Sequence, residues 1–416
     1  MVSAFLAPIS IVAAFGSLLP ANTLYAAGRS ALHDCAAADP DQRIAACTRL
    51  LQDRRARATD RAAAYYHRGN GHLQKEAYER AIRDFSQAIR LDPKSPRNYN
   101  GRAIGYREKG DPDRAIADFN RAIRLNRKYT LAYNNRAIAY GDKRNFERAI
   151  ADYSAAIALD PKYVIAYYNR AKEFRDHGHF DRAIADLGVV IGLEPNDDEA
   201  YRERGKAHLD NGEPERAIAD FTAAIRIDPN EGELYIDRGN AYRDRGDYQH
   251  AIDDYGEAIR IDPKDVDAHR HRAIAHFHAG ERAKAQTDLQ RAGELSPQNP
   301  HVALWQAIVE RRNTFASGLA QGASQLDMSD WPAPVIRLFR GELTPAKVLA
   351  AAQEGSAKRR RLQVCEANFY SAEFTLMQGG TDEAGRLFRV AASECPHSLT
   401  EWGAANAELK ALGVTP

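Results

Sequence analysis

The sequence has almost no net charge and only four cysteines, three methionines and three tryptophans. Its 416 residues contain 58 lysines and arginines against 57 aspartates and glutamates, so the net charge is only +1. A nucleic-acid-binding protein needs a basic surface that displaces counterions from phosphates, and this balance argues against one. The mean hydropathy of −0.56 excludes a protein with many membrane spans. Hydrophobic residues make up 44% of the chain, which is enough for a folded core.

Charged side chains are absent from residues 1–27, and most of the stretch from Ala4 to Leu19 is apolar. Small residues follow at positions 26–28, where a signal peptidase could cleave. This segment resembles a secretory signal peptide, so we expect export to the periplasm. An uncleaved segment that anchors the protein to the membrane is the alternative, and membrane association is expected only if the segment is retained. A frayed N-terminus in the cytoplasm is the remaining reading.

Motifs of common enzymes are also missing. The sequence contains no Gly-x-Ser-x-Gly, no His-Glu-x-x-His and no phosphate-binding loop. Four histidines are clustered at His269, His271, His276 and His278, but those that share a helical face are seven residues, about 10 Å, apart. One metal ion cannot bind both members of such a pair. The sequence therefore predicts no catalytic residue, no metal site and no cofactor.

The dominant feature is a 34-residue period that runs without a break from Ala62 to Asn299, in seven units. Counting from the first residue of each unit, position 8 is always Gly or Ala, and position 20 is always Ala. Position 4 is Tyr in six units, and position 24 is aromatic or Leu. Positions 4, 8 and 11 share one helical stripe, and positions 20, 24 and 27 share another. Each unit is therefore predicted to be a hairpin of two helices that approach closely at the small residues.

One hairpin cannot bury its own apolar face, so the units must stack into a solenoid. The pattern resembles the tetratricopeptide repeat. This resemblance implies an all-α fold, a right-handed superhelical solenoid of helical hairpins with capping helices at both ends. It also implies that the first helices of the hairpins line a concave groove.

The same pattern predicts where the parts of the chain begin and end. They are a signal peptide or anchor (1–27), an N-terminal capping segment with a truncated repeat (28–61), seven repeats (62–299), an irregular helical segment (300–364), an eighth repeat-like unit (365–398) and a C-terminal capping helix (399–416).

Two charged positions recur in all seven units: position 7 is always Arg and position 23 is always Asp. The usual repeat has a leucine-like residue at position 7, so an arginine there should be partly buried and in need of a partner. We expect one Arg–Asp pair per repeat, either within a unit or between adjacent units.

The four cysteines form two pairs at spacings that suit helical hairpins. Together with an export signal, they predict two disulfides, Cys35–Cys47 and Cys365–Cys395, which would staple the terminal units. The alternative is four buried free thiols.

Residues 300–416 resemble the NlpI group of bacterial tetratricopeptide lipoproteins at Trp331-Pro332, Glu366-Ala-Asn-Phe-Tyr370 and Glu408-Leu409. Members of that group are cell-envelope adaptors that hold peptidoglycan endopeptidases and bring them to a processing protease, and they dimerise. The resemblance therefore implies an envelope adaptor and a homodimer. This chain has more repeats and lacks the small residues of a lipobox before Cys35, so neither the lipid anchor nor the partners are carried over.

Positions 2, 5, 9, 12 and 13 of each unit should face the groove. The candidate ligand contacts at these positions are Arg107, Asn134, Tyr168, Lys172, Arg175, Arg202, Lys206, Asn240 and Arg243. A mixed-charge groove suits an extended peptide or a partner helix. We therefore expect a non-catalytic scaffold that binds envelope proteins such as peptidoglycan hydrolases or proteases. An assembly factor or chaperone for a membrane or secretion complex is the first alternative. An enzyme with its catalytic module in residues 300–416 is disfavoured, because no nucleophile–base spacing is present.

Overall fold

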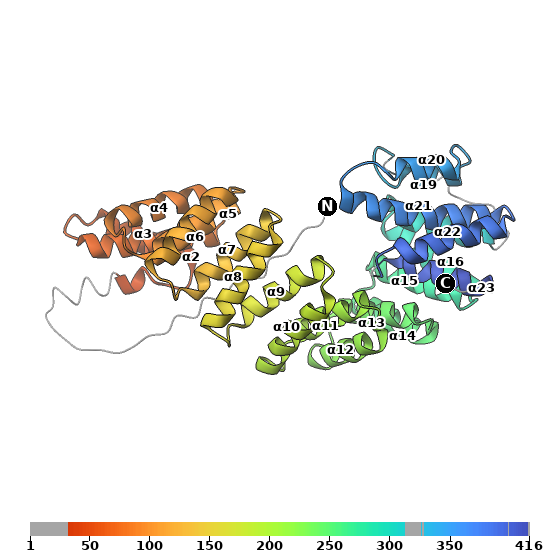
Figure 1. The fold of residues 1–416 in the computed structure, drawn as a ribbon, viewed down its shortest axis with the longest axis horizontal. Coiled ribbons are helices and arrows are strands. Elements are labelled where there is room, and N and C mark those ends of the chain that lie inside the picture. Colours follow the sequence, from red (N-terminus) through yellow and green to blue (C-terminus); the bar gives the residue numbers. More distant parts are fainter. Residues whose placement is uncertain (1–31, 313–325, 327, 398, 415–416) are drawn as a thin grey trace. The chain divides into compact units, whose positions relative to one another are not determined.

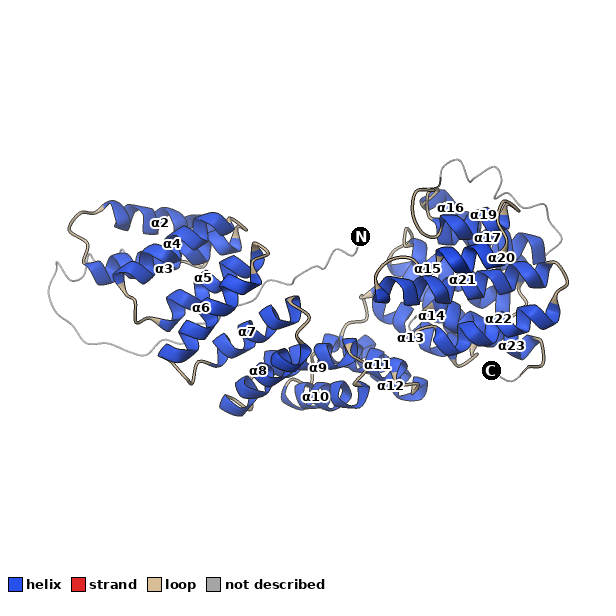
Figure 2. Cartoon of the chain, turned by 45° about the horizontal axis from the view of Figure 1, so that its top comes forward, coloured by secondary structure: helices blue, strands red, loops and turns tan. Residues whose placement is uncertain are grey.

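The computed structural model describes residues 32–312, 326, 328–397 and 399–414 (Figure 1). The expected signal segment, residues 1–27, lies outside the described residues. Within these ranges every helix or strand assigned is a helix (Figure 2). The prediction of an all-α solenoid built from stacked helical hairpins is therefore confirmed.

The chain divides into two compact units, residues 1–161 and 162–416. The first unit contains α2 (Pro40–Gln52), α3 (Ala58–Gln74), α4 (Tyr78–Leu91), α5 (Pro96–Glu108), α6 (Pro112–Leu125), α7 (Thr130–Asp142) and α8 (Phe146–Leu159). Helices α3 and α4, α5 and α6, and α7 and α8 pair as hairpins, and each hairpin packs on the next. Helix α2 packs on α3, which agrees with a truncated repeat at this end.

The second unit continues the same arrangement. Its repeats comprise α9 (Val164–Asp176), α10 (Phe180–Leu193), α11 (Asp198–Asp210), α12 (Pro214–Ile227), α13 (Gly232–Asp244), α14 (Tyr248–Ile261), α15 (Val266–His278) and α16 (Arg282–Leu295). Helix α17 (Pro300–Arg312) follows them and packs on α15 and α16, where the first helix of a further repeat would stand. Its last part comprises α19 (Ala333–Phe339), α20 (Pro345–Ala351), α21 (Ala357–Met377), α22 (Thr381–Glu394) and α23 (Thr400–Ala411). Helix α21 begins at Ala357 rather than at the predicted boundary of 365, because Ser356 caps it and accepts a hydrogen bond from the Arg359 N–H.

Small residues bring the two helices of a hairpin together, as the repeat predicts. A Cβ at Gly205 would lie 2.7 Å from the ring of Phe221, and a Cβ at Gly239 would lie 2.7 Å from the ring of Tyr255. Both glycines stand at position 8 and both rings at position 24. The aromatic ring thus occupies the space that a side chain at position 8 would need, and the alanines at position 20 are fully buried.

The arginine of each repeat pairs with the aspartate of the same repeat. Arg136 Nε and Nη2 each donate to a different oxygen of Asp152, both at 2.6 Å. The other six pairs, with N–O distances of 2.6–2.8 Å, are Arg68–Asp84, Arg102–Asp118, Arg170–Asp186, Arg204–Asp220, Arg238–Asp254 and Arg272–Asp288. The aspartates are buried, so the prediction of one partly buried pair per repeat is confirmed, and the pair forms within a unit.

Several of these arginines also connect one repeat to the one before it. Arg102 Nη1 donates to the Ser86 hydroxyl at 3.2 Å, and Arg136 Nη1 donates to Asn120 Oδ1 at 2.6 Å. Arg238 Nη1 donates to the Thr222 hydroxyl at 3.1 Å. All three acceptors stand at position 25 of the preceding repeat. The guanidinium therefore holds three helices together.

Both predicted disulfides are present in the structure. Cys35 and Cys47 have Cα atoms 4.7 Å apart, and Cys365 and Cys395 have Cα atoms 4.9 Å apart. The first disulfide ties the segment before α2 to that helix, and the second ties α21 to the end of α22. Each stands in a terminal part of the solenoid, where a repeat lacks one neighbour.

Candidate partner-binding surface

The first helices of successive repeats contact one another and form one surface in each unit, which we call the inner face. In the first unit α3 contacts α5, and α5 contacts α7. In the second unit α11 contacts α13, α13 contacts α15, and α15 contacts α17. The residues predicted to face the groove all lie on these first helices, and their contacts show which of them are open to a ligand.

Helix α9 is joined to α11 by polar contacts across the inner face of the second unit. Arg175 Nη1 donates to Glu203 Oε2 at 2.6 Å, and Arg175 Nε lies 3.8 Å from Asp210 Oδ2. The Tyr168 hydroxyl donates to Glu199 Oε1 at 3.2 Å. Two of the predicted candidates, Tyr168 and Arg175, thus reach from one first helix to the next.

Helix α11 is joined to α13 in the same way. Arg202 Nε donates to Asp237 Oδ2 at 2.7 Å, and Arg202 Nη2 pairs with Glu233. Lys206 Nζ lies 3.3 Å from Glu203 Oε1 and 3.6 Å from Asp237 Oδ2. Glu203 and Asp237 were missed by the sequence analysis because they stand at position 6, which was not assigned to the groove. Acidic residues at this position in two successive repeats were the signal that could have found them.

Burial and charge together set the protonation of this surface. Burial raises the pKa of Asp210 and of the Tyr168 hydroxyl. For Arg202, burial lowers the pKa, but the contacts with Asp237 and Glu233 outweigh it and leave the pKa raised. At neutral pH Arg202 is therefore a cation and Tyr168 a neutral hydrogen-bond donor.

Lys172 is the predicted candidate that is most open to a ligand. It is exposed on α9 and has no ion-pair partner among the residues that the structure describes. It lies beside Tyr168, Arg175, Leu187 and Glu203. Its ammonium group is available to an anionic group of a partner.

Two further candidates lie on α13, and neither is an open contact. Asn240 Oδ1 accepts a hydrogen bond from the Tyr255 hydroxyl at 2.8 Å. The Arg243 side chain is only 3% exposed and donates to Asp244 Oδ1 at 2.9 Å. Helix α23 lies over this pair, since a Cβ at Gly403 would be 2.4 Å from Asp244 Oδ1. The prediction of Arg243 as an accessible groove residue is therefore wrong, because α23 covers it.

The inner face of the first unit contains a group of buried amides. Asn134 is 3% exposed and donates to Asn135 Oδ1 at 3.5 Å, and Asn135 in turn donates to Asn100 Oδ1 at 3.1 Å. The prediction of Asn134 as an exposed ligand contact is therefore wrong, because its amide is buried between first helices. Arg107 Nε lies 4.0 Å from Asp142 Oδ2 on the next first helix.

Large apolar side chains at position 2 are exposed on one first helix of each unit. Leu131 on α7 is 41% exposed, and Ile165 on α9 is 48% exposed. The sequence analysis assigned position 2 to the groove but did not single out these two residues. Each provides an apolar contact next to the polar residues of its own unit.

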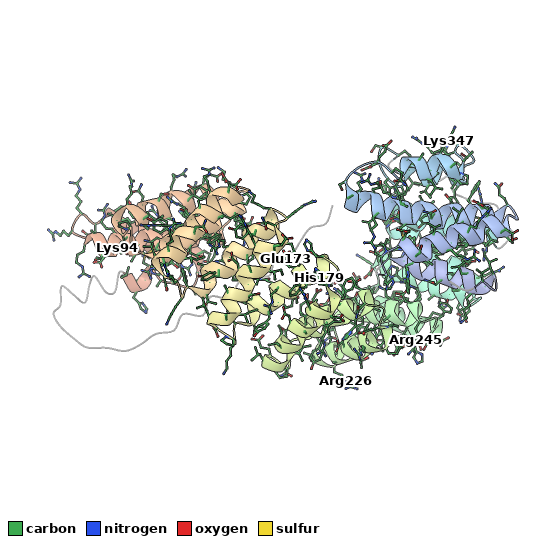
Figure 3. All side chains as sticks on the ribbon, in the orientation of Figure 1. Lys94, Glu173, His179, Arg226, Arg245 and Lys347 are labelled. Atoms are coloured by element: carbon green, nitrogen blue, oxygen red, sulfur yellow. A yellow bond between two sulfur atoms is a disulfide. The ribbon has the colours of Figure 1, made fainter. Side chains whose placement is uncertain are left out.

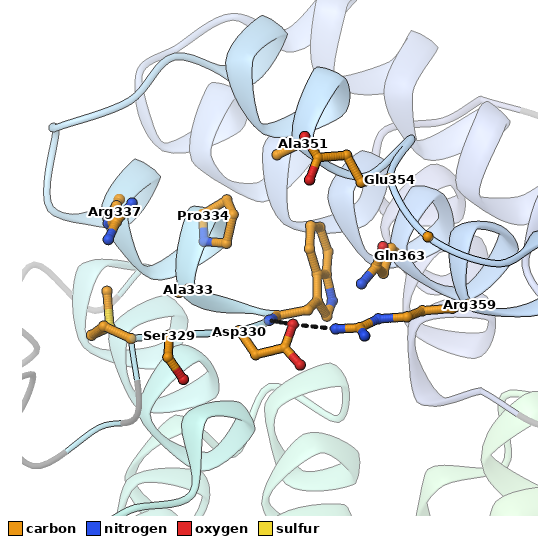
Figure 4. Close-up of a pocket in the computed structure, with 12 residues that line it drawn as sticks. Ser329, Asp330, Ala333, Pro334, Arg337, Ala351, Glu354, Arg359 and Gln363 are labelled. Carbon is orange, nitrogen blue, oxygen red and sulfur yellow. Dashed lines mark hydrogen bonds and ion pairs between the residues drawn. The ribbon is translucent and has the colours of Figure 1, made fainter.

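A separate cavity of about 340 Å³ lies among α19, α20 and α21 (Figure 4). Asp330 and Arg359 form an ion pair at its edge. The Trp331 indole lines the cavity and donates from Nε1 to Glu366 Oε2 at 2.8 Å. The tryptophans beyond residue 299 were the only sign of this cavity in the sequence.

Metal sites and membrane-spanning helices are both lacking in the part of the chain that the structure describes. There, no three His, Cys, Asp or Glu side chains are placed to bind a metal ion. No helix in the same ranges has the length and apolar character needed to cross a bilayer.

Models of protein families match the repeats. A model of the TPR repeat matches residues 239–280, and models of the tetratricopeptide repeat match residues 62–95, 97–129, 130–163 and 168–232. This chain carries tetratricopeptide repeats. Tetratricopeptide solenoids use extended concave surfaces to bind other proteins or peptides. The family matches end at residue 280, and the resemblance of residues 300–416 to the NlpI group stays a prediction.

Solved structures of other tetratricopeptide proteins are similar in fold. The C-terminal part of a TPR repeat-containing protein from Cytophaga hutchinsonii is 22% identical with a TM-score of 0.50, over 57% of this chain and 97% of that one. A tetratricopeptide repeat protein from Parabacteroides merdae is 18% identical with a TM-score of 0.44, over 59% and 96%. YrrB, described as a TPR protein with an unusual peptide-binding site, is 21% identical with a TM-score of 0.39, over 44% and 95%.

Proposed function

We propose that this chain is a non-catalytic scaffold of the bacterial cell envelope that binds protein or peptide partners on its inner faces. The observation that carries the proposal is the network of ion pairs between α9, α11 and α13. Arg175 and Arg202 each contact a carboxylate on the next first helix. Lys206 contacts a carboxylate on its own helix, that of Glu203. These side chains are already held in place, so they lose little conformational entropy when a partner binds. Less of the binding free energy is therefore spent on ordering them.

The chemistry of α9 indicates the kind of partner. The exposed Lys172 ammonium can pair with an acidic side chain, and Ile165 offers an apolar contact on the same helix. An extended peptide or a helix that carries an acidic and an apolar residue fits this arrangement.

Three features support a place in the envelope. Residues 1–27 resemble a signal peptide, and residues 300–416 resemble the NlpI group. The two disulfides also favour export, because disulfides persist in oxidising compartments such as the periplasm. On this basis we propose that the partners are envelope proteins, with peptidoglycan hydrolases or proteases as the first to test.

Crosslinking and affinity capture from a bacterial envelope extract test the proposal. The wild-type chain is compared with Lys172→Glu on α9 and with Arg226→Glu, a matched charge reversal on the second helix α12 (Figure 3). Lys172→Glu should capture partners about tenfold less efficiently, whereas Arg226→Glu should behave as wild type.

The identity of the captured proteins decides between the two functions. Hydrolases or proteases that depend on Lys172 support the adaptor, whereas pore or pilus subunits favour an assembly factor. If wild type, Lys172→Glu and Arg226→Glu capture partners equally well, binding on the inner face of α9 is contradicted. Hydrolysis of peptidoglycan or casein by the purified chain would contradict a non-catalytic role.

A further inference from the structure

The C-terminal helix α23 occupies the inner face of the last repeats of the second unit. Glu408 Oε2 accepts a hydrogen bond from Arg312 Nη2 of α17 at 3.0 Å, and Glu408 Oε1 lies 3.8 Å from His278 Nδ1 of α15. Gly403 lies on Asp244 of α13, where a Cβ would not fit. One short helix therefore covers the surface formed by three first helices.

The residues before and at the start of α23 extend this contact. His397 Nδ1 lies 3.3 Å from the carbonyl oxygen of Leu209 on α11. Thr400 Oγ1 lies 3.5 Å from His271 Nε2 on α15. His397 and residues 399–408 thus lie over the same kind of surface that the other repeats leave open for a partner.

Several buried polar atoms at the interface under α23 lack a hydrogen-bond partner. Among the described residues, Arg243 Nη1, His271 Nδ1 and His278 Nε2 are buried without a hydrogen-bond partner. Arg312 Nη1 has only an ion pair with Glu373 Oε2 of the adjacent α21, at 3.6 Å. A buried polar atom without a partner loses its hydration and gains nothing in return, so these atoms oppose the seated position of α23.

The hairpins themselves are built differently. Their buried residues are mostly alanines and aromatic rings, and each buried aspartate has its arginine at hydrogen-bond distance. The surface of α13, α15 and α17 that α23 covers, which we call the seat, instead presents guanidinium and imidazole groups. Burial lowers the pKa of His278 to about 3 and raises that of Glu408, so both groups are costly to bury. These polar groups oppose the burial of the surface under α23, whereas Ala404, Ala405 and Leu409 of α23 are buried in the hydrophobic core of the unit and hold the helix in place.

We propose that the inner face of α13, α15 and α17 is a second partner-binding surface, and that α23 is its built-in competitor. The chemistry of α23 describes the partner: a helix with two carboxylates seven residues apart, as at Glu401 and Glu408, and a glycine where it crosses Asp244. Glu408 bonds to Arg312, and Glu401 accepts a hydrogen bond from Tyr370 of α21 and interacts through its charge with Arg270 of α15. Seven residues of helix span about 10 Å, so both carboxylates lie on one face. Such a helix takes the seat when α23 leaves it.

Two variants of the full chain release α23 by different means. Gly403→Val places methyl groups against Asp244, and Ala411→Val on the exposed side of the same helix is its control. Glu408→Lys sets a cation against Arg312 and His278, and Lys410→Glu at an exposed site is its control. Hydrogen exchange of the α23 amides reports release, and circular dichroism reports the fold.

The probe is a fluorescein-labelled peptide of residues 397–416, followed by fluorescence anisotropy. It should bind both release variants at least about tenfold more tightly than wild type or the controls, because the competent fraction of the seat is larger. A peptide with Glu401→Gln and Glu408→Gln should bind about tenfold more weakly than the natural one.

Three results would overturn the proposal. In the first, the α23 amides of both release variants exchange as slowly as in wild type. In the second, α23 is released but neither variant binds the peptide. In the third, both release variants lose the helical signal of the whole unit, which shows that α23 is an integral part of the fold. Because the probe is a segment of this chain, none of these results bears on partner capture by Lys172.

Discussion

The two units share one repeat but present different inner faces. In the first unit buried asparagines bond to one another between first helices, and Leu131 is exposed beside them. In the second unit ion pairs join α9, α11 and α13, and α23 covers the helices that follow. The hairpin positions are the same in both units, so the framework of the repeat is independent of the surface. The character of the inner face is therefore set by a few positions, including position 6, that packing leaves free to vary.

Removing the aspartate of an Arg–Asp pair should cause the largest loss of stability, and the loss should be equal in both units. Asp152→Ala in the first unit and Asp220→Ala in the second each leave a partly buried arginine without its partner. Each should lower the free energy of unfolding by roughly 3–5 kcal/mol in urea denaturation. Asp113→Ala is the control, because its partner Lys143 and Asp113 itself are largely exposed, and should change stability by less than about 1 kcal/mol. A change at Asp152 as small as the control would mean that the pair adds no stability.

The two disulfides should contribute different amounts of stability. Cys365–Cys395 spans 30 residues and Cys35–Cys47 spans 12. Loop entropy predicts that replacing the longer pair by serines costs about 3.6 kcal/mol and the shorter about 2.8 kcal/mol. Thermal unfolding of the two double-serine variants, with and without reductant, measures this order. If reductant destabilises both double-serine variants as much as wild type, the disulfides are not the source of the effect.

Histidine protonation should cause the smallest loss of stability. The loss should be larger for His278 in the second unit than for His67 in the first. Burial lowers the pKa of His278 in the second unit to about 3 and that of His67 in the first to about 4. A depressed histidine pKa stabilises the fold above about pH 6.5, and this stability is lost as the pH falls. Between pH 7.5 and 5.5, His278 should account for about 1.4 kcal/mol of lost stability. His67 should account for less because solvent screens it more.

Denaturation of His278→Gln and His67→Gln at the two pH values tests this order. Each variant should lose stability less steeply with falling pH than wild type, and the difference should be larger for His278→Gln. An unchanged pH dependence in His278→Gln would show that this imidazole stays uncharged in both states or is hydrated in the fold.

Most of the framework could be predicted from the sequence, because its determinants are local. Position 8 and position 24 are sixteen residues apart, and so are Arg136 and Asp152, so one period contains both members of each contact. The disulfides follow from the same hairpin spacing. The accessible part of the inner face could not be predicted, because it depends on contacts between distant residues. Arg243 looked open in its own repeat, and only the contact with Gly403 shows that it is covered.

The hydrogen bonds from Arg102 and Arg136 to position 25 of the preceding repeat bear on how such an array can grow. At three junctions the arginine of one repeat donates to a Ser, Asn or Thr side chain at position 25 of the preceding repeat, always in the same register, whereas Gly188 and Gly256 at this position offer no side-chain acceptor. A copy of a repeat with a polar position 25, inserted after another such repeat, therefore finds an acceptor behind it and a donor ahead of it. Gene duplication in steps of 34 residues can lengthen the chain without leaving a broken bond at either seam.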